Sequence, residues 1–241
     1  MRGLALRNSC AILALTLCCA ASASSSKPIK PATLRWTNAQ PGATFSAGSD
    51  GRYVYGLRSG DKDIAITVDT QETEKSRHRH AAVFSVYIQI RNLGQRYWKV
   101  ELEGVSLEFV KHFHVIQPAM DPSDLAQQLQ SSADELDHQA ALAKSDPSAK
   151  GGLDKPFVRA YQKETSEFIE FISKHSLRDT VLDAGNQETE GWVYFSTKSK
   201  WLGKWKAQEA FIFRLPLGGV VYEFPFSLPP KPGEMALRER H

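Results

Sequence analysis

Two groups of residues in this sequence have side chains that could do chemistry, and the first combines a glutamate with histidines. Glu108, His112 and His114 are spaced so that an unbroken strand would turn all three to one face. Alternate residues of a strand lie roughly 6.5–7 Å apart, so two imidazoles could converge on one ion. His80 could add a further ligand from elsewhere in the chain. Neutral imidazole suits zinc or copper, which makes a metal-handling or hydrolytic site one hypothesis.

The residues around these histidines argue against a metal. Arg77 and Arg79 flank His78 and His80 and would repel a cation. The simpler interpretation is that the histidines face solvent on the surface of a sheet. The sequence therefore predicts no metal and no other cofactor, and the histidine site remains the alternative.

The second group is a loop that mixes tryptophan with lysine. The predicted binding residues are Trp201, Trp205, Lys198, Lys200 and Lys204. Exposed tryptophans stack on sugars or lie at membrane interfaces, and lysines attract acidic groups. Loops on a rigid scaffold often carry the binding residues of a protein. In the alternative, both tryptophans fold back and cover the end of the core.

No sequence motif of a known catalytic site accompanies these groups. The chain lacks a Gly-x-Ser-x-Gly elbow, a phosphate-binding glycine loop, a dinucleotide fingerprint and a His-Glu-x-x-His pair. Its three cysteines, Cys10, Cys18 and Cys19, all lie in the N-terminal segment. A binding protein is therefore favoured over an enzyme.

That N-terminal segment has the three parts of a secretory signal. Arg2 and Arg7 supply positive charge, Cys10–Ala21 is apolar, and Ala21-Ser22-Ala23 offers the small residues that a signal peptidase reads. The apolar run is shorter than the about 20 residues that span a bilayer. We expect residues 1–23 to be a cleaved signal peptide and the protein to be periplasmic or extracellular.

A lipid anchor is the alternative to simple export. Leu15–Cys18 loosely resembles a bacterial lipobox, in which Cys18 would be lipidated, although Leu17 occupies a position that normally holds a small residue. No transmembrane segment is expected in the mature chain. Loss of Arg2 and Arg7 leaves 28 basic against 27 acidic residues, so the near-neutral charge argues against nucleic acid as a partner.

Apolar residues that alternate with polar ones predict most of the mature chain to be β-strand. About seven strands are expected, and the clearest are Ile64–Asp69, Phe84–Arg91, Val105–Phe109, Trp192–Phe195, Phe211–Leu215 and Val220–Phe224. Gly218-Gly219 predicts a hairpin between the last two. Pro225 predicts that the last strand ends there or lies at an edge. In the strand that carries the histidines, Phe109, Phe113 and Val115 would share the other face.

The middle of the chain changes to a helical period. Asp121 and Pro122 form a helix start, with an apolar stripe that follows at Leu125, Leu129, Leu136, Ala140 and Ala143. A second stripe comes after a Gly/Pro-containing loop, at Phe157, Tyr161, Phe168 and Ile172. Together they predict an antiparallel helical hairpin that packs on itself and on one end of the sheets. It is either a structural insertion or a partner-binding arm.

These elements predict a mainly β fold, an immunoglobulin-like antiparallel β-sandwich with the helical hairpin inserted. The sandwich would span residues 34–228, with the insertion at about 121–176. A linker at 24–33 would precede it and a tail at 229–241 would follow. A parallel α/β fold is disfavoured because strands and helices do not alternate.

The strand segments resemble the exported immunoglobulin-like, telokin-like domains of uncharacterised bacterial proteins. The residues that carry the resemblance are Ile64–Asp69, Phe84–Asn92 with the turn Asn92-Leu93-Gly94, Glu190–Phe195 and Phe211–Leu215. The segment Leu107–Pro118 is also similar to that of uncharacterised exported proteins of soil bacteria. The resemblance covers about half of the mature chain and implies a fold, with no catalytic residue.

The combined prediction is a non-catalytic exported binding or assembly module of the bacterial cell envelope. Its partner would be an envelope protein or a glycan, met by the loop with Trp201 and Trp205 or by the helical hairpin. The alternative is a metal-handling or hydrolytic periplasmic protein that uses Glu108, His112, His114 and His80.

Overall fold

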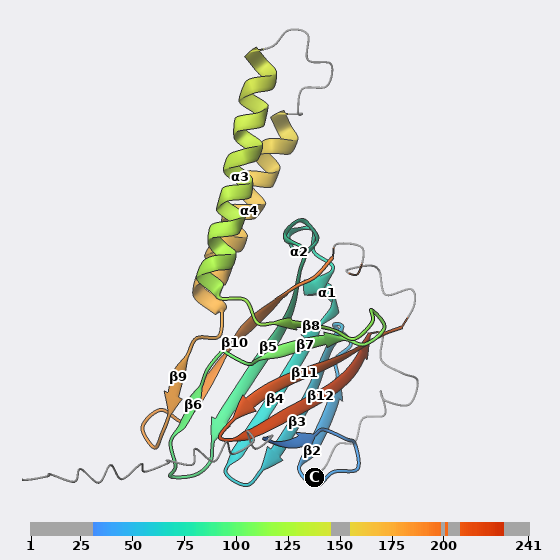
Figure 1. The fold of residues 1–241 in the computed structure, drawn as a ribbon, viewed down its shortest axis with the longest axis vertical. Coiled ribbons are helices and arrows are strands. Elements are labelled where there is room, and N and C mark those ends of the chain that lie inside the picture. Colours follow the sequence, from blue (N-terminus) through green and yellow to red (C-terminus); the bar gives the residue numbers. More distant parts are fainter. Residues whose placement is uncertain (1–30, 146–154, 199–200, 202–207, 229–241) are drawn as a thin grey trace, which may run out of the picture. The chain divides into compact units, whose positions relative to one another are not determined.

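The computed structural model describes residues 31–145, 155–198, 201 and 208–228. The segments expected to be the signal peptide and the C-terminal tail lie outside these residues, as do Lys200, Lys204 and Trp205. The described chain is mainly β, and its strands form two five-stranded sheets and one two-stranded sheet. A helical hairpin extends from one end of the sheets (Figure 1).

Sheet A collects strands from both ends of the described chain. Its order is β1 (Ala32–Arg35), β12 (Val220–Leu228), β11 (Glu209–Leu217), β7 (Ser106–Phe109) and β8 (Val115–Pro118). All its pairs are antiparallel except β1 with β12. β1 begins at Ala32, inside the segment that was expected to be linker. The predicted hairpin at Gly218-Gly219 joins β11 to β12, and both glycines have a positive φ.

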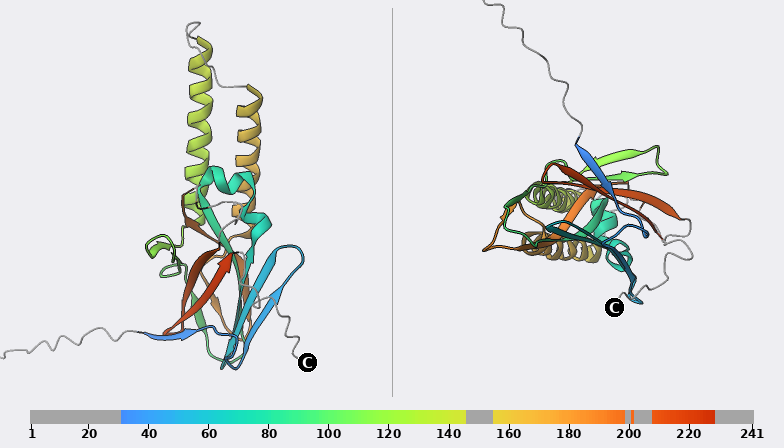
Figure 2. Two further views of the ribbon diagram at one scale, coloured as in Figure 1. Left: turned by 90° about the vertical axis from the view of Figure 1, so that its right-hand side faces the viewer. Right: turned by 90° about the horizontal axis from the view of Figure 1, so that it is seen from below.

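Sheet B is formed by strands that are mostly consecutive in sequence. Its order is β10 (Glu188–Ser196), β5 (Val83–Asn92), β4 (Lys62–Asp69), β3 (Arg52–Ser59) and β2 (Ala43–Ala47), all antiparallel. The short strands β6 (Trp98–Val100) and β9 (Thr180–Leu182) pair beside them as the two-stranded sheet. Figure 2 shows the strands of both sheets from two further sides.

One hydrophobic core lies between the two large sheets. The inward residues of the predicted strands Ile64–Asp69 and Phe84–Arg91 are buried, as the alternation required. Phe84 of sheet B stacks on Phe211 of sheet A with ring centroids 5.1 Å apart, and Phe211 stacks on Phe226 at 5.0 Å. Phe195 meets Phe213 edge to face at 6.0 Å. Side chains of both sheets therefore fill the same interior.

The prediction that Pro225 ends the last strand is wrong, and β12 is not an edge strand over its whole length, although its β1 side is unpaired at Pro225. β12 continues to Leu228 and lies between β1 and β11. The carbonyl of Glu223 accepts a hydrogen bond from Trp36 N–H, so the backbone polar groups of Glu223 face the β1 side of the strand. The backbone nitrogen of Pro225, two residues later, faces the same side. β1 has ended at Arg35, so the missing N–H of Pro225 costs no ladder bond. The described chain also has twelve strands instead of about seven, because several are only three to five residues long.

The two long helices lie where the sequence predicted a helical hairpin. α3 spans Pro122–Ser145 and α4 spans Lys155–His175. The Asp121 carboxylate accepts hydrogen bonds from the N–H groups of Ser123 and Asp124, which caps α3. Two short helices, α1 (Thr70–Thr73) and α2 (Ser76–Ala81), were not predicted. No helix in the described residues is long and apolar enough to cross a membrane.

The base of the helical hairpin is fixed to sheet B by a second apolar cluster. Leu125 of α3 and Phe168 and Ile172 of α4 pack on Val83 and Tyr194, which point outward from β5 and β10. Beyond α4 the chain passes directly over β10, where Leu177 N–H donates to the carbonyl of Trp192 at 2.9 Å. The hairpin and the sheets therefore share a packed joint.

Replacement of Gly191 by alanine is expected to loosen this joint. A β-carbon at Gly191 would collide with the backbone nitrogen of Leu177 and lie 2.6 Å from its Cα, and backbone cannot move aside cheaply. Gly191→Ala should therefore lower the free energy of unfolding by about 1–3 kcal/mol. Gly185→Ala is the control, because the nearest atom to its β-carbon is 3.5 Å away. Equal stability of the two variants in urea denaturation would contradict the close crossing.

Candidate functional site at the tip of the β7–β8 hairpin

The segment with Glu108, His112 and His114 is a hairpin and not one strand. β7 ends at Phe109, β8 begins at Val115, and the two strands pair with Phe109 opposite Val115. The prediction that Glu108, His112 and His114 share one strand face is therefore wrong. The chain turns between them because His112 N–H donates to the Phe109 carbonyl and Val115 N–H to the His112 carbonyl, at 3.1 and 3.3 Å.

The last turn of this hairpin has an unusual sequence for its backbone. Phe113 and His114 have φ values of +58° and +55°, and the bond from Val115 N–H to His112 completes the pattern of a type I′ turn. Such turns favour Asn-Gly or Gly-Gly, because a left-handed backbone crowds a β-carbon. The β11–β12 hairpin uses Gly218-Gly219 with positive φ at the corresponding place. The β7–β8 hairpin thus accepts strain that glycine would remove.

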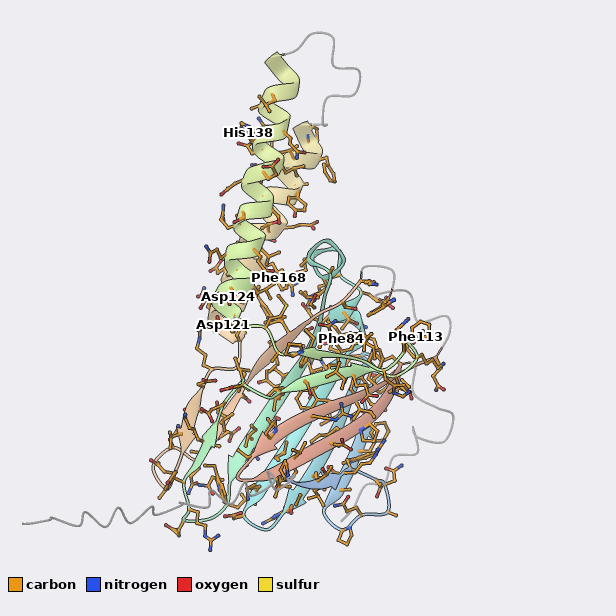
Figure 3. All side chains as sticks on the ribbon, in the orientation of Figure 1. Phe84, Phe113, Asp121, Asp124, His138 and Phe168 are labelled. Atoms are coloured by element: carbon orange, nitrogen blue, oxygen red, sulfur yellow. The ribbon has the colours of Figure 1, made fainter. Side chains whose placement is uncertain are left out.

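Phe113 is almost fully exposed at this turn. Its relative exposure is 98%, the highest among the exposed large apolar residues of the described chain. Figure 3 labels Phe113 at the end of the β7–β8 hairpin. The prediction that it shares an apolar face with Phe109 is wrong, because the strand ends before residue 113.

The predicted binding residue Trp201 lies against this hairpin. Its ring stacks on His112 with centroids 4.2 Å apart and planes 14° from parallel, and lies 5.3 Å from Phe109. Lys198 places its Nζ 5.2 Å from the centroid of the Trp201 ring. Trp201 is partly buried and packs on the core, as the fold-back alternative expected for it. His112 and Trp201, 89 residues apart in sequence, therefore meet at one place.

These residues define a patch, which we name the tip patch: Lys111, His112, Phe113, Lys198 and Trp201. Lys111 and Lys198 are both exposed. Lys111 Nζ donates to the carbonyl of Gln208, and His112 Nε2 lies 3.4 Å from the Glu209 carboxylate. The patch therefore combines a stacked His112–Trp201 pair and an exposed Phe113 with two exposed lysines.

Glu108 forms a buried ionic network below the tip patch. Its carboxylate accepts hydrogen bonds from His114 Nδ1 at 2.5 Å and from the Arg214 guanidinium. Arg214 also donates to Glu223 at 2.9 Å, which links β7, β11 and β12 across the outer face of sheet A. Burial alone would raise the pKa of Glu108, but the hydrogen bonds from His114 and Arg214 lower it overall.

This network leaves Glu108, His112 and His114 without the geometry of a shared metal site. The described residues contain no group of three His, Cys, Asp or Glu side chains that could hold a metal ion. Arg214 occupies one oxygen of Glu108, and its charge would repel a cation. His112 instead stacks on Trp201. The side chain of His80 lies outside the described residues.

His78, expected near the surface, is buried in a second ionic cluster. It is 1% exposed, and its Nε2 lies 3.1 Å from the carboxylate of Glu72, which also accepts hydrogen bonds from Arg77 and Lys75. Burial would raise the pKa of Glu72, but these three partners lower it well below its usual range. The Arg77 guanidinium also lies over Phe168 and Phe171 of α4. The cluster therefore supports the base of the helical hairpin.

Sequence patterns identified Trp201, Lys198 and the histidines but missed Phe113 and Arg214. Phe113 was assigned to an apolar strand face, and no local pattern marks a left-handed turn built from Phe-His. Arg214 and Glu223 are charged residues within two otherwise apolar strands, and this feature of the sequence could have indicated the ionic network.

Comparison of this chain with protein-family models, with curated proteins and with solved structures gives no match.

Replacement of Glu108 by glutamine should make the free energy of unfolding less dependent on pH in the acidic range. Because the folded-state pKa of Glu108 is lowered, its contribution is present above its unfolded-state pKa and is lost as the pH falls through the folded-state value. Glu108→Gln should cost about 1–3 kcal/mol at pH 7. The difference from the unchanged protein should shrink below about pH 4.

Urea denaturation between pH 3 and pH 7 measures the free energy of unfolding of the variant and of the unchanged protein at each pH. Glu188→Gln, which removes a carboxylate from an exposed pair with Arg91, is the control and should change stability much less. A constant difference between Glu108→Gln and the unchanged protein over this range would show that the ionised carboxylate adds nothing.

Proposed function

We propose that this protein is a non-catalytic exported module of the bacterial cell envelope that binds an envelope protein through the tip patch. Its fold would be an immunoglobulin-like β-sandwich, consistent with two mainly antiparallel sheets around one core and a helical insertion between β8 and β9. The export signal predicted at residues 1–23 supports the location, which would be periplasmic or extracellular.

The observation that carries the proposal is the exposure of Phe113 on a strained turn. An apolar side chain that stays in water does not contribute the free energy that its burial would provide. A left-handed backbone costs about 1–2 kcal/mol for a residue with a β-carbon. Both costs are offset when a partner covers the ring. Local strain of this kind is typical of recognition sites. Gly218-Gly219 in the β11–β12 hairpin shows that the chain can build an unstrained turn.

The rest of the tip patch suits a protein partner. Trp201 and His112 form a stacked platform held by Phe109, so little side-chain freedom would be lost on binding. Aromatic side chains are the commonest anchors of protein interfaces. Lys111 and Lys198 would meet acidic groups around an apolar pocket on the partner. The helical hairpin would then be a structural insertion, because its base is fixed to sheet B.

Site-specific photo-crosslinking tests this proposal directly. The photoreactive residue p-benzoylphenylalanine, placed at position 113 of the exported full-length chain, should give a discrete protein adduct in illuminated cells. The same residue at position 97 is the control, since Tyr97 is 74% exposed in the loop after β5, outside the tip patch. Adducts of equal yield at both positions, or adducts with lipid or glycan alone, would contradict a protein partner at the tip.

Phe113→Gly should stabilise the protein and weaken partner binding together. Glycine relieves the left-handed backbone and removes the exposed ring, so the free energy of unfolding should rise by up to about 1 kcal/mol. Formation of the partner complex, measured with the crosslinked partner once purified, should weaken at least tenfold. Tyr97→Gly removes a comparable exposed ring and should leave binding unchanged. Phe113→Gly with unchanged affinity would show that the ring does not bind.

A further inference from the structure

A groove on the outer face of sheet B has the features of a second binding site. It is lined by Arg52, Val54, Thr67, Asp69, Tyr87 and Trp192 and has a volume of about 450 Å³. This volume lies in the range that accommodates a small ligand. None of these residues belongs to the tip patch, so the groove stands independently of the proposed function.

Pairing of four strands aligns the floor and the wall of the groove. Val54, Thr67, Tyr87 and Trp192 are successive partners across β3, β4, β5 and β10. The row therefore changes from small side chains to two aromatic rings along the sheet. Tyr87 and Trp192 meet edge to face at 5.3 Å, and Trp192 is held from behind by Phe171 of α4 at 6.2 Å. Val54 and Thr67 therefore form the floor of the groove, and the packed rings of Tyr87 and Trp192 form its wall.

A paired arginine and aspartate close the end of the groove next to α1. Arg52 Nε donates to Asp69 Oδ2 at 3.0 Å, while Asp69 Oδ1 accepts from Glu72 N–H and caps α1 at 2.9 Å. Among the described residues, the Nη groups of Arg52 and the Nε1 group of Trp192 donate no hydrogen bond. Arg52 and Trp192 therefore offer N–H groups that could donate to a ligand in the groove.

The charges around the groove favour a neutral ligand. The charge of Arg52 is balanced by Asp69, and Asp50 lies 3.7 Å from the same guanidinium. Burial and the neighbouring Glu190 carboxylate raise the pKa of Tyr87 to about 12, so its hydroxyl remains protonated. An anionic ligand would be repelled by the carboxylates of Asp50 and Asp69, because the charge of Arg52 is already balanced. The hydroxyl groups of a neutral ligand can form hydrogen bonds with the donors and acceptors of the groove.

We propose that this groove binds a neutral pyranose saccharide. One face of a pyranose is rich in C–H groups and can stack on Trp192 or Tyr87, while its hydroxyl groups can accept from Arg52 and exchange hydrogen bonds with Thr67. On the same face of sheet B, Ala65 and Gln89 form the next cross-strand row and extend the surface beside the groove. A chain of several sugar units therefore fits better than a single sugar.

Calorimetric titration of the full chain with soluble tetrasaccharides tests the proposal. The probes are maltotetraose, cellotetraose and chitotetraose, with tetragalacturonate as the anionic comparison. At least one neutral probe should bind and change the tryptophan fluorescence, and tetragalacturonate should not bind. No binding of the neutral probes at millimolar concentration, or binding of tetragalacturonate alone, would overturn the proposal.

Two variants locate the binding and one separates it from the tip patch. Trp192→Ala removes the aromatic wall, and Thr67→Tyr fills the floor without any change to the apolar cluster below the hairpin; each should weaken binding at least tenfold. Phe113→Gly should leave saccharide binding intact. Unchanged affinity in Thr67→Tyr, or loss in Phe113→Gly, would show that the saccharide binds elsewhere.

Discussion

The phenylalanine stack between the two sheets is the interaction on which the other features of this structure depend. Phe84 comes from sheet B, Phe211 and Phe226 come from sheet A, and their centroids lie 5.0–6.4 Å apart. Once these rings point inward, the period of a strand determines the side of every neighbouring residue. Tyr87 and Trp192 must then face outward from sheet B, and Glu108 and Arg214 outward from sheet A.

The same stack supports the tip of the β7–β8 hairpin. Phe109, the last residue of β7, has its ring centroid 6.2 Å from that of Phe84, 5.5 Å from that of Phe211 and 5.3 Å from that of Trp201. The turn beyond it can therefore hold Phe113 in a left-handed conformation because the strands on either side are firmly packed. A core with little stability to spare would not tolerate such a turn.

The α2 helix and the β7–β8 hairpin are each held by a buried carboxylate that has an arginine and a histidine as partners. Glu72 binds Arg77 and His78 where α2 meets α4, and Glu108 binds Arg214 and His114 below the tip patch. A buried carboxylate is stable only while its partners remain in place, so these clusters define the position of the elements more than they add net stability. The His78 and His114 side chains therefore contribute to holding these elements in place.

Much of the secondary structure followed from the sequence because it depends on local periodicity. The strands at Ile64–Asp69 and Phe84–Arg91, the Gly218-Gly219 hairpin and the start of α3 at Pro122 all carry their signal within a few residues. The sequence could not show that β7 ends at Phe109, because the alternation from Val105 to Val115 looks the same whether the chain continues or turns. It also placed Pro225 at an edge, since the length of β1 on one side of β12 is a property of the whole sheet.

The candidate sites depended on contacts between distant segments. Residue types alone selected Trp201, Lys198, His112 and Glu108, because aromatic, basic and imidazole groups have limited chemical uses. Only the tertiary structure decided that His112 stacks on Trp201 and that Arg214 neutralises Glu108, since these partners are 89 and 106 residues apart. The groove of Arg52, Thr67 and Trp192 likewise exists only when four strands, β3, β4, β5 and β10, are paired. Sequence determines which side of a strand a residue occupies, and packing determines what lies opposite it.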